Sequence, residues 1–272
     1  MKYRLPDGRS VHCLSRTDAA LVFEEIFACD VYRRHGITIR AGDCILDVGA
    51  NIGAFPLFVE SLGLPATVYS LEPVPAIFEV LRRNATLCPT LRLHLRAIGL
   101  GARAGETAFT FYPSLPSNST CHAEAASRDE AWTLAYIEQR FRDHPNRLLR
   151  SLLGALPRSL RGAVAAGVYR HYYRGERVVC RVCTLSGFIR DERLEHVDLL
   201  KLDVERSELD ILTGLEEADW PKIRQAVVEV HDDSDVAPVA ERFERHGFRV
   251  TVERHACYDN RTMLYATSGR QR

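Results

Sequence analysis

The sequence predicts an α/β fold built on an open parallel sheet with helices on both faces. Strand-like apolar runs alternate with helical patterns over residues 43–112 and again from residue 177 onwards, which is typical of such sheets. Residues 44–58, CILDVGANIGAFPLF, join a strand ending in Asp47 to a glycine turn and a helix. Because ligands bind at the carboxyl ends of the strands in these folds, this turn predicts a ligand site.

The first half of the sheet is expected within residues 43–112. Its strand segments are short apolar runs bounded by Gly, Pro and Asn, and apolar residues recur at helical spacing between them. The expected elements are a strand at 44–49, a helix at 53–63, a strand at 66–73, a helix at 75–87, and strands at 91–99 and 107–112.

The second half, residues 177–272, resumes the alternation and ends differently. The last two strand patterns follow one another without a helix between them, which predicts an antiparallel hairpin at one sheet edge. The expected elements are strands at 177–185 and 197–205, a helix at 207–217, a strand at 223–231, a helix at 236–246, and strands at 248–253 and 262–268.

Between the halves, residues 113–176 are expected to form a helical insert that acts as a lid or partner surface, and residues 1–42 an N-terminal cap segment. Helical patterns occur at 124–142 and 146–172, and a structureless loop of this length is uncommon in a compact domain. The latter part of the insert and the residues just after it are rich in arginine: Arg140, Arg142, Arg147, Arg150, Arg158, Arg161, Arg170, Arg174 and Arg177.

The composition excludes several classes of protein. Apolar residues make up 46% of the 272 residues, enough for a substantial core, and Lys plus Arg equals Asp plus Glu at 36 each. No apolar run is long enough for a membrane span, and the N-terminal residues lack the apolar run of a signal peptide. The cysteines described next lead us to expect a cytoplasmic location. The eight cysteines are scattered, and buried free thiols are favoured over zinc or redox chemistry, including for Cys180 and Cys183.

The glycine turn after the first strand indicates the kind of ligand. Asp47, Gly49, Asn51 and Gly53 put small residues where a backbone approaches a ligand closely, and the next helix offers free N–H groups at its start. A dinucleotide site favours the spacing G-x-G-x-x-G for a pyrophosphate, which this turn lacks. The acid suits a cationic or amine-bearing ligand better than a phosphate.

The next two strands also end in residues suited to a nucleoside. Glu72, followed by Pro73, can accept hydrogen bonds from two ribose hydroxyls, and Ala97 with Ile98 can face an adenine ring. Adenosine and an amino-acid cation together make S-adenosylmethionine, which is the predicted cofactor. The alternative is an ordinary strand–turn–helix whose acids are incidental.

Several linked motifs then resemble one family. DVGANIGAF, EPVPAIFEVLRRN, CTLSGFI, VDLLKLDVERSELDILTGL and VVEVH are similar to motifs of the FkbM family of S-adenosylmethionine-dependent methyltransferases, over about residues 43–100 and 180–232. The resemblance implies a class I fold, a Rossmann-like seven-stranded sheet whose last strand is antiparallel, and S-adenosylhomocysteine as product. It also implies that Asp47, Gly49 and Gly53 cradle the methionine part and that Glu72 holds the ribose.

Acids and a histidine follow the two later strands. Asp203 and Glu205 end one, Glu229 and His231 end the other, and neighbouring strands bring them to the place of the methyl group. We expect Asp203 at the cofactor and His231 as general base for a hydroxyl, oriented by Glu205 or Glu229. Two alternatives stay open. The same four residues can bind Mg²⁺, or His231 is simply a satisfied histidine at a strand end.

Residues outside the sheet are candidates for binding the methyl acceptor. They are Asn118 and Ser119 in a Pro/Ser loop, Tyr172 in YRHYYRG, and Arg206, which stands where the family usually has the glycine of DVEG. The alternatives are a turn and helix cap for the loop, packing of a helix face for Tyr172, and an altered backbone at Arg206.

Together these patterns predict an O-methyltransferase of secondary metabolism. The resemblance implies acceptors such as natural products, sugars and carrier-bound polyketide chains. The basic insert favours a β-hydroxyacyl chain on an acyl carrier protein, which is acidic and carries a phosphopantetheine arm. Nucleic acid fits the charge, but no RNA-binding motif accompanies it. A sugar or free metabolite as acceptor, or a non-catalytic cofactor-binding module that recruits a partner, are the alternatives.

Overall fold

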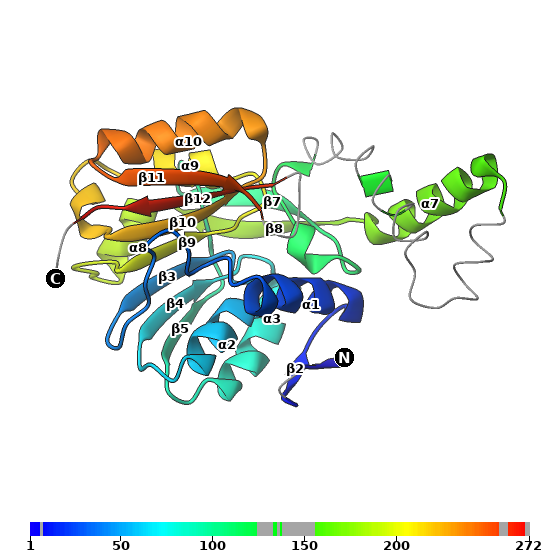
Figure 1. Ribbon diagram of the computed structural model, residues 1–272, viewed down its shortest axis with the longest axis horizontal. Helices are drawn as coiled ribbons and strands as arrows, with labels where there is room; N and C mark the ends of the chain where they lie inside the picture. The colour runs from blue at the N-terminus through cyan, green and yellow to red at the C-terminus, as the bar shows by residue number, and fades with distance from the viewer. Residues whose placement is uncertain (6–7, 124–132, 135–136, 138–155, 256–260, 270–272) are drawn as a thin grey trace.

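The structure is a computed structural model that describes residues 1–5, 8–123, 133–134, 137, 156–255 and 261–269. Seven strands of the described chain form the central sheet in the order β11-β12-β10-β9-β3-β4-β5. β12 runs antiparallel to both of its neighbours, β10 and β11, whereas β10, β9, β3, β4 and β5 are parallel. The predicted sheet and its terminal hairpin are therefore confirmed (Figure 1). The strands are β3 (Cys44–Val48), β4 (Thr67–Leu71), β5 (Arg92–Arg96), β9 (Leu199–Leu202), β10 (Gln225–Val230), β11 (Arg249–Arg254) and β12 (Thr262–Thr267).

Two cores lie on the two faces of this sheet because its side chains alternate between them. On β3, Ile45 belongs to one core and Leu46 to the other, and Val227 and Val228 on β10 divide in the same way. The first core packs against α2 (Ala54–Ser61) and α3 (Pro75–Asn84), and the second against α8 (Leu185–Asp191), α9 (Glu208–Thr213) and α10 (Asp233–Arg245).

The four helices predicted at 53–63, 75–87, 207–217 and 236–246 were located correctly, with shifted ends. The predicted helix at 75–87 is α3 followed by a 3₁₀ turn at Ala85–Leu87. The predicted helix at 236–246 begins three residues earlier, because the side chain of Asp232 accepts a hydrogen bond from the backbone N–H of Ser234 and caps α10. The predicted helix at 207–217 is the shorter α9.

A second sheet corrects two predictions. The strands at 107–112 and 177–185 were both expected in the central sheet, but β8 (Glu176–Cys183) lies between β6 (Gly99–Leu100) and the antiparallel β7 (Gly105–Phe111) in a three-stranded sheet. Phe111 pairs with Glu176, so the two ends of the insert leave the body side by side. The strand pattern was correct, but a pattern alone does not choose the partner strand.

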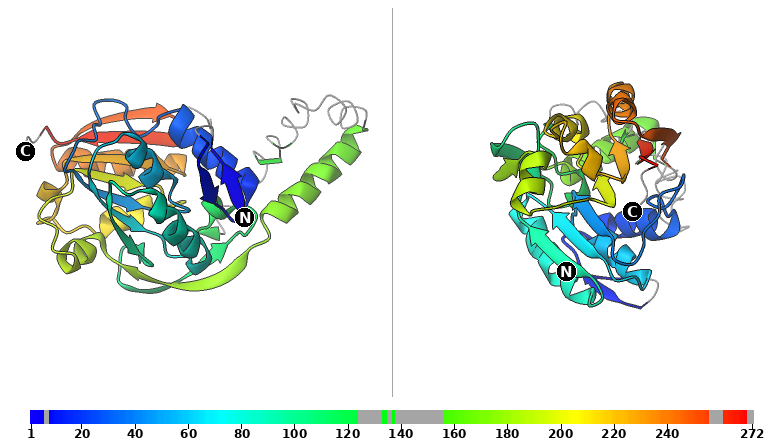
Figure 2. Two further views of the ribbon diagram at one scale, coloured as in Figure 1. Left: turned by 90° about the horizontal axis from the view of Figure 1, so that it is seen from below. Right: turned by 90° about the vertical axis from the view of Figure 1, so that its left-hand side faces the viewer.

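Helix α7 (Arg158–Tyr172) belongs to the insert and extends away from the body of the molecule (Figures 1 and 2). It confirms the described part of the predicted helix at 146–172. Of the predicted helix at 124–142, only residues 133, 134 and 137 are among the described residues. The arginines from Arg140 to Arg150 lie outside them. The structure does not test the division of the chain into a cap, two half-sheets and an insert, which remains a prediction.

The N-terminal segment packs across the carboxyl ends of the central strands. It consists of β1 (Lys2–Arg4), β2 (Ser10–His12) and α1 (Arg16–Phe23), which continues as a π-helix over Glu24–Ala28. The side chain of Asn84 bonds both the backbone N–H and the C=O of His12, at 2.7 Å and 2.9 Å, and so fixes this segment to α3.

Two findings bear on location and cysteine chemistry. Among the described residues, no helix combines the length and the apolar character that crossing a membrane requires. Cys88 and Cys180 are buried free thiols, as expected, whereas Cys44 and Cys183 are free but half-buried and Cys29 is disulfide-bonded.

Candidate active site

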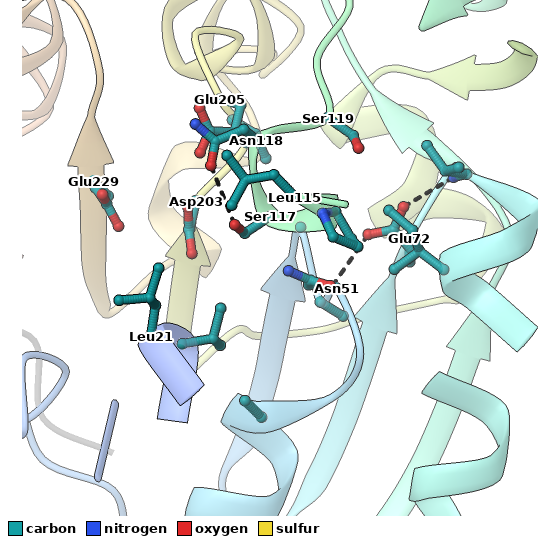
Figure 3. A pocket seen from close by; sticks show the side chains of 18 of the residues that line it. Leu21, Asn51, Glu72, Leu115, Ser117, Asn118, Ser119, Asp203, Glu205 and Glu229 are labelled. Carbon is teal, nitrogen blue, oxygen red and sulfur yellow. Dashed lines mark hydrogen bonds between the residues drawn. The ribbon is translucent and has the colours of Figure 1, made fainter. Parts of the chain in front are cut away.

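A cavity of about 370 Å³ lies at the carboxyl ends of β3, β4, β9 and β10. Figure 3 shows that Glu229, Asp203, Asn51 and Glu72 follow one another across it, each at or just beyond the carboxyl end of a different strand. Helix α1 and the loop 115–119 cover it, and Val168 and Tyr172 of α7 reach its wall. The parallel strands therefore bring together residues that are up to 178 positions apart in sequence, between Asn51 and Glu229 (229 − 51).

The glycine turn has the close approach that its residues predicted. Gly49 has φ +77°, and a Cβ at this position would lie 1.8 Å from the backbone oxygen of Asp203. Asn51, also left-handed at φ +47°, lines the cavity, and its buried Oδ1 has no hydrogen-bond partner among the described residues. Gly53 begins α2 at φ +90°, against Leu81, and lies off the described cavity wall. The turn thus offers an unused polar atom to a ligand.

Glu72 occupies the second strand end as predicted. Its Oε1 accepts a hydrogen bond from the backbone N–H of Val74 at 2.9 Å, and its Oε2 accepts one from that of Asn51 at 3.1 Å. Burial raises the pKa of this carboxyl to about 7, although the two backbone bonds oppose the shift. Pro73 and Ile98 line the cavity beside it, whereas Ala97 lies off the described wall.

Glu72 gives a pH-dependent prediction. Ribose hydroxyls donate hydrogen bonds to the carboxylate, so protonation of Glu72 below its pKa of about 7 turns one of its two acceptor oxygens into a donor. The affinity for S-adenosylhomocysteine is therefore expected to fall as pH drops through 7, by up to about tenfold per pH unit. Calorimetric titration across this range checks it, with Glu72→Gln as control. The same steep pH dependence in the Gln variant would contradict the assignment.

Asp47 lies beneath the cavity wall instead of on it. It is fully buried and pairs with Lys201 of β9, Nζ to Oδ1, at 3.0 Å, and it accepts a hydrogen bond from Ser70. Lys201 does line the cavity, and it also donates to the backbone oxygen of Gly49 at 2.9 Å. Asp47 therefore supports the turn through Lys201, a residue that the sequence argument missed.

Carboxylates dominate the charge of the described cavity wall. With every group ionised, the five acids and two bases that line it carry a formal charge of −3 (2 − 5), and a bound cation favours that ionised state of the buried acids. Burial raises the pKa of Glu205 and raises that of Glu229 well above its usual value. A wall of this kind suits a ligand that carries positive charge. The charged residues are Glu25, Glu72, Asp203, Glu205, Glu229, Lys201 and Arg261.

His231 lies behind this wall, which corrects the expected arrangement. Its Nδ1 is 2.6 Å from Oε1 of Glu208, a buried residue that the sequence argument missed. Its Nε2 is 3.3 Å from Glu205 and 3.6 Å from Glu229, and it has no hydrogen-bond partner among the described residues. Glu208, more closely than Glu205 or Glu229, fixes the ring, and the two wall carboxylates separate His231 from the cavity.

The acidic end brings together two sets of side chains with metal-ligand chemistry. One set is Asp203, Glu229 and His231, three of the four residues considered for Mg²⁺, and ligand atoms of this set lie within 4.8 Å of one another. The other set is Glu25, Glu229 and His255. Cations of the protein already lie here: Arg261 is 3.4 Å from Glu205 and 3.3 Å from Glu229, and Lys201 is 3.5 Å from Asp203.

The loop over the cavity contains two of the predicted acceptor residues. Asn118 and Ser119 line the wall, and Asn118 ends a 3₁₀ turn at Pro116–Asn118. Asn118 also donates to the hydroxyl of Tyr173 at 3.2 Å, and Ser117 donates to the buried Asp18 of α1 at 2.5 Å. The loop is therefore both a structured turn and part of the cavity wall, and α1 fixes it in place.

Arg206 does not reach the described cavity wall, contrary to its expected role in acceptor binding. It keeps the left-handed backbone that favours glycine, with φ +80°, and Glu205 before it has φ +49°. Its side chain is 7% exposed and lies 3.5 Å from Asp232. Arg206 thus adopts a strained backbone conformation that glycine takes more easily, and its side chain points toward the start of α10.

The sheet order, the terminal antiparallel strand and the cavity at the strand ends define a class I methyltransferase fold. The family model of the methyltransferase FkbM domain matches residues 47–250. The chain is 35% identical over 251 residues to the 31-O-demethyl-FK506 methyltransferase FkbM of Streptomyces tacrolimicus, which covers 92% of this chain and 89% of that protein. This protein therefore belongs to the FkbM methyltransferase family and is an S-adenosylmethionine-dependent methyltransferase.

Two further comparisons extend this result. The AMB antimetabolite synthetase AmbE of Pseudomonas aeruginosa is 34% identical over 261 residues, which are 93% of this chain but 12% of the synthetase. The crystal structure of methyltransferase FkbM from Methylobacillus flagellatus has a TM-score of 0.51 at 14% identity, covering 90% of this chain and 47% of that one. AmbE is a large synthetase, and the likeness to the crystal structure supports the fold.

Proposed function

We propose that the protein transfers the methyl group of S-adenosylmethionine to a hydroxyl of a natural-product intermediate. The observation that carries this proposal is the cavity itself, where a ribose-binding acid, Glu72, and two proton-accepting acids, Glu205 and Glu229, lie at opposite sides (Figure 3). The arrangement leaves room for a cofactor along the strand ends and for an acceptor at the acidic side.

The residues at the Glu72 side fit the nucleoside part of the cofactor. Both carboxylate oxygens of Glu72 keep a lone pair after bonding the backbone, so each can still accept from a ribose hydroxyl. Pro73, Ile98 and Phe109 form an apolar wall for the adenine ring. The turn at Gly49 and Asn51, held by Lys201 above Asp47, lies next to the methionine part. The negative cavity favours the sulfonium and ammonium charges.

The bound cofactor supplies an electrophilic methyl group, and the protein must align the acceptor and remove its proton. We assign the first proton-accepting role to Glu229 or Glu205, which face the cavity. Burial raises their pKa values, which makes their carboxylates stronger bases. His231 then takes the proton at Nε2, because Glu208 holds its other nitrogen. The histidine acts through the wall carboxylates instead of touching the acceptor.

This assignment needs no metal ion, because Arg261 and Lys201 already balance part of the carboxylate charge. Dialysis against EDTA is therefore expected to leave the rate of methyl transfer unchanged, and added Mg²⁺ is expected not to raise it. Rates measured before chelation, after it and after re-addition check this. A loss in EDTA that Mg²⁺ restores would instead assign Asp203, Glu229 and His231 as ligands.

The acceptor we propose is a β-hydroxyacyl chain on a carrier protein. Arg170 and Arg174 near the end of α7 and Arg177 on β8 are exposed, and they lie next to Tyr172 and Tyr173 on the cavity wall. Exposed arginines suit the acidic surface and phosphate of a carrier arm. The similarity to the antimetabolite synthetase AmbE supports an acceptor held within an assembly, whereas the relative named for 31-O-demethyl-FK506 supports a natural product as acceptor.

Intact-mass spectrometry tests the acceptor class. A β-hydroxybutyryl carrier protein and the same acyl group on a free pantetheine thioester are each incubated with the protein and S-adenosylmethionine. A mass gain of one methyl on the carrier-bound species alone is the expected result. Methylation of free sugars or late-stage products in parallel reactions, with neither thioester changed, would replace this acceptor. Bound cofactor with no acceptor methylated would favour a non-catalytic module.

A further inference from the structure

A cluster of nucleophilic and titratable side chains lies just beyond the loop that covers the cavity. The Sγ of Cys121 is 3.2 Å from the Oγ of Ser207, and Nε2 of His122 is 3.2 Å from Oδ2 of Asp210. The backbone N–H of His122 donates to Oγ1 of Thr120 at 3.0 Å, and this bond holds residues 120–122 in a tight turn. Two segments, 120–122 and 207–210, thus build one cluster of Cys, His, Asp and Ser.

The surroundings of the thiol stabilise its ionised form. Burial alone would raise the pKa of Cys121, but hydrogen bonds from His122 and Ser207 outweigh it, and the pKa lies below its ordinary value. The hydrogen bond with Cys121 raises the pKa of His122 to about 9, and Asp210 adds to this shift. Compared with an ordinary cysteine, Cys121 in this cluster therefore favours the thiolate, with His122 as the imidazolium beside it, which is the arrangement that activates a cysteine.

The other free thiols of the described residues differ from Cys121. Burial raises the pKa to about 11 for Cys44, Cys180 and Cys183 and to about 12 for Cys88, and it also raises that of Cys13. These thiols pack as small apolar side chains. Cys121 is half-buried, and the His122 and Asp210 side chains beside it are 38% and 52% exposed, so a small reagent can approach from that side.

We propose that Cys121, activated by His122 and Asp210, is a modification site for small soft electrophiles, with a hydroperoxide as the natural class. In this step the thiolate sulfur attacks one oxygen of hydrogen peroxide and the O–O bond breaks. The departing hydroxide takes the proton from His122 and leaves as water. The sulfur is oxidised to a sulfenic acid and the peroxide is reduced, so atoms and electrons balance.

The Cys121 cluster adjoins the methyl-transfer cavity, but Cys121 has no role in the proposed methyl transfer. Ser207, the contact of the thiol, lines the cavity, and Oγ1 of Thr120 donates to the backbone oxygen of Glu205 at 2.6 Å. An oxygen added to Sγ enlarges the group that contacts Ser207. Modification of Cys121 therefore acts on the strained turn that carries Glu205.

Competitive labelling within one protein tests the proposal. The full chain is treated with hydrogen peroxide and dimedone at pH 7, and peptide mapping by mass spectrometry gives the labelling rate at each cysteine. Cys121 is expected to react about tenfold faster than Cys183, which is also half-buried, because its larger thiolate fraction outweighs its lower intrinsic nucleophilicity. Cys183 is thus a control within the same folded molecule.

His122→Gln tests the activation, with the exposed His171→Gln as its matched control. The first variant is expected to slow labelling of Cys121 about tenfold and the second to leave it unchanged, while labelling of Cys183 stays constant in both. Equal rates at Cys121 and Cys183 in the unmodified protein would overturn the proposal. An unchanged Cys121 rate in His122→Gln would overturn it as well.

Discussion

Replacing Glu229 by Gln is expected to slow methyl transfer by about 10²–10⁴-fold, the usual effect of removing a general base. The amide cannot take the acceptor proton, but its oxygen still faces Arg261, so the fold of the wall is retained. The affinity for S-adenosylhomocysteine should change little, because this product lacks the sulfonium charge. Single-turnover rates with the proposed carrier-bound acceptor, and calorimetry with the product, separate the two effects.

The pH profile and a matched variant sharpen this prediction. The rate of the unmodified protein should rise with pH as Glu229, whose pKa is raised well above its usual value, becomes ionised. Glu253→Gln is the control, since Glu253 lies on β11, which β12 separates from β10, and pairs with Arg34 and His35 away from the described cavity wall. Full activity in Glu229→Gln, with a large loss in Glu205→Gln, would move the base to Glu205. Full activity in both variants would show that neither Glu229 nor Glu205 takes the acceptor proton.

Replacing Gly49 by Ala is the second change with a large expected effect. The new Cβ would lie 1.8 Å from the backbone oxygen of Asp203, in a left-handed conformation at φ +77°. Strain and overpacking together are expected to lower the free energy of unfolding by about 2–5 kcal/mol. Relief of the clash must push Asp203 away from the turn, so cofactor binding should be lost even where the variant still folds.

Gly42→Ala separates strain from the close approach. Gly42 has φ +82°, nearly that of Gly49, but a Cβ there meets nothing within 4 Å. This control should therefore cost only about 1–2 kcal/mol and leave the affinity for S-adenosylhomocysteine intact. Thermal unfolding and calorimetry of both variants check the pair. Equal effects of the two substitutions would mean that the contact between the turn and Asp203 does not shape the site.

The sequence predicted the cavity because its chemistry is local. Asp47 lies at the end of a strand with a clear apolar pattern, Gly49, Asn51 and Glu72 follow such strands, and parallel strands place their ends at one edge. The same logic placed Glu205 and Glu229 beside each other. The depth of each side chain was not predicted. Glu205 and Glu229 line the cavity and His231 lies behind them, since a linear pattern does not tell which side chains stand in front.

Partners that come from elsewhere in the chain could not be predicted. Glu25 reaches the cavity from a π-helix and Arg261 from the start of the last strand, and neither lies in a motif. Lys201 did carry a signal, because a lysine inside the apolar strand LLKL must be paired to be buried. The pairing of β8 with β7 was likewise hidden, because it depends on where the insert leaves the body.

A crystal structure of the protein with S-adenosylhomocysteine tests the central claim most directly. The account predicts the ribose hydroxyls on the carboxylate of Glu72, the adenine between Pro73 and Ile98, and the sulfur directed toward Glu205 and Glu229. A product molecule bound in the reverse direction, with its sulfur away from these two carboxylates, would contradict the proposed proton path. Its binding outside this cavity would contradict the site itself.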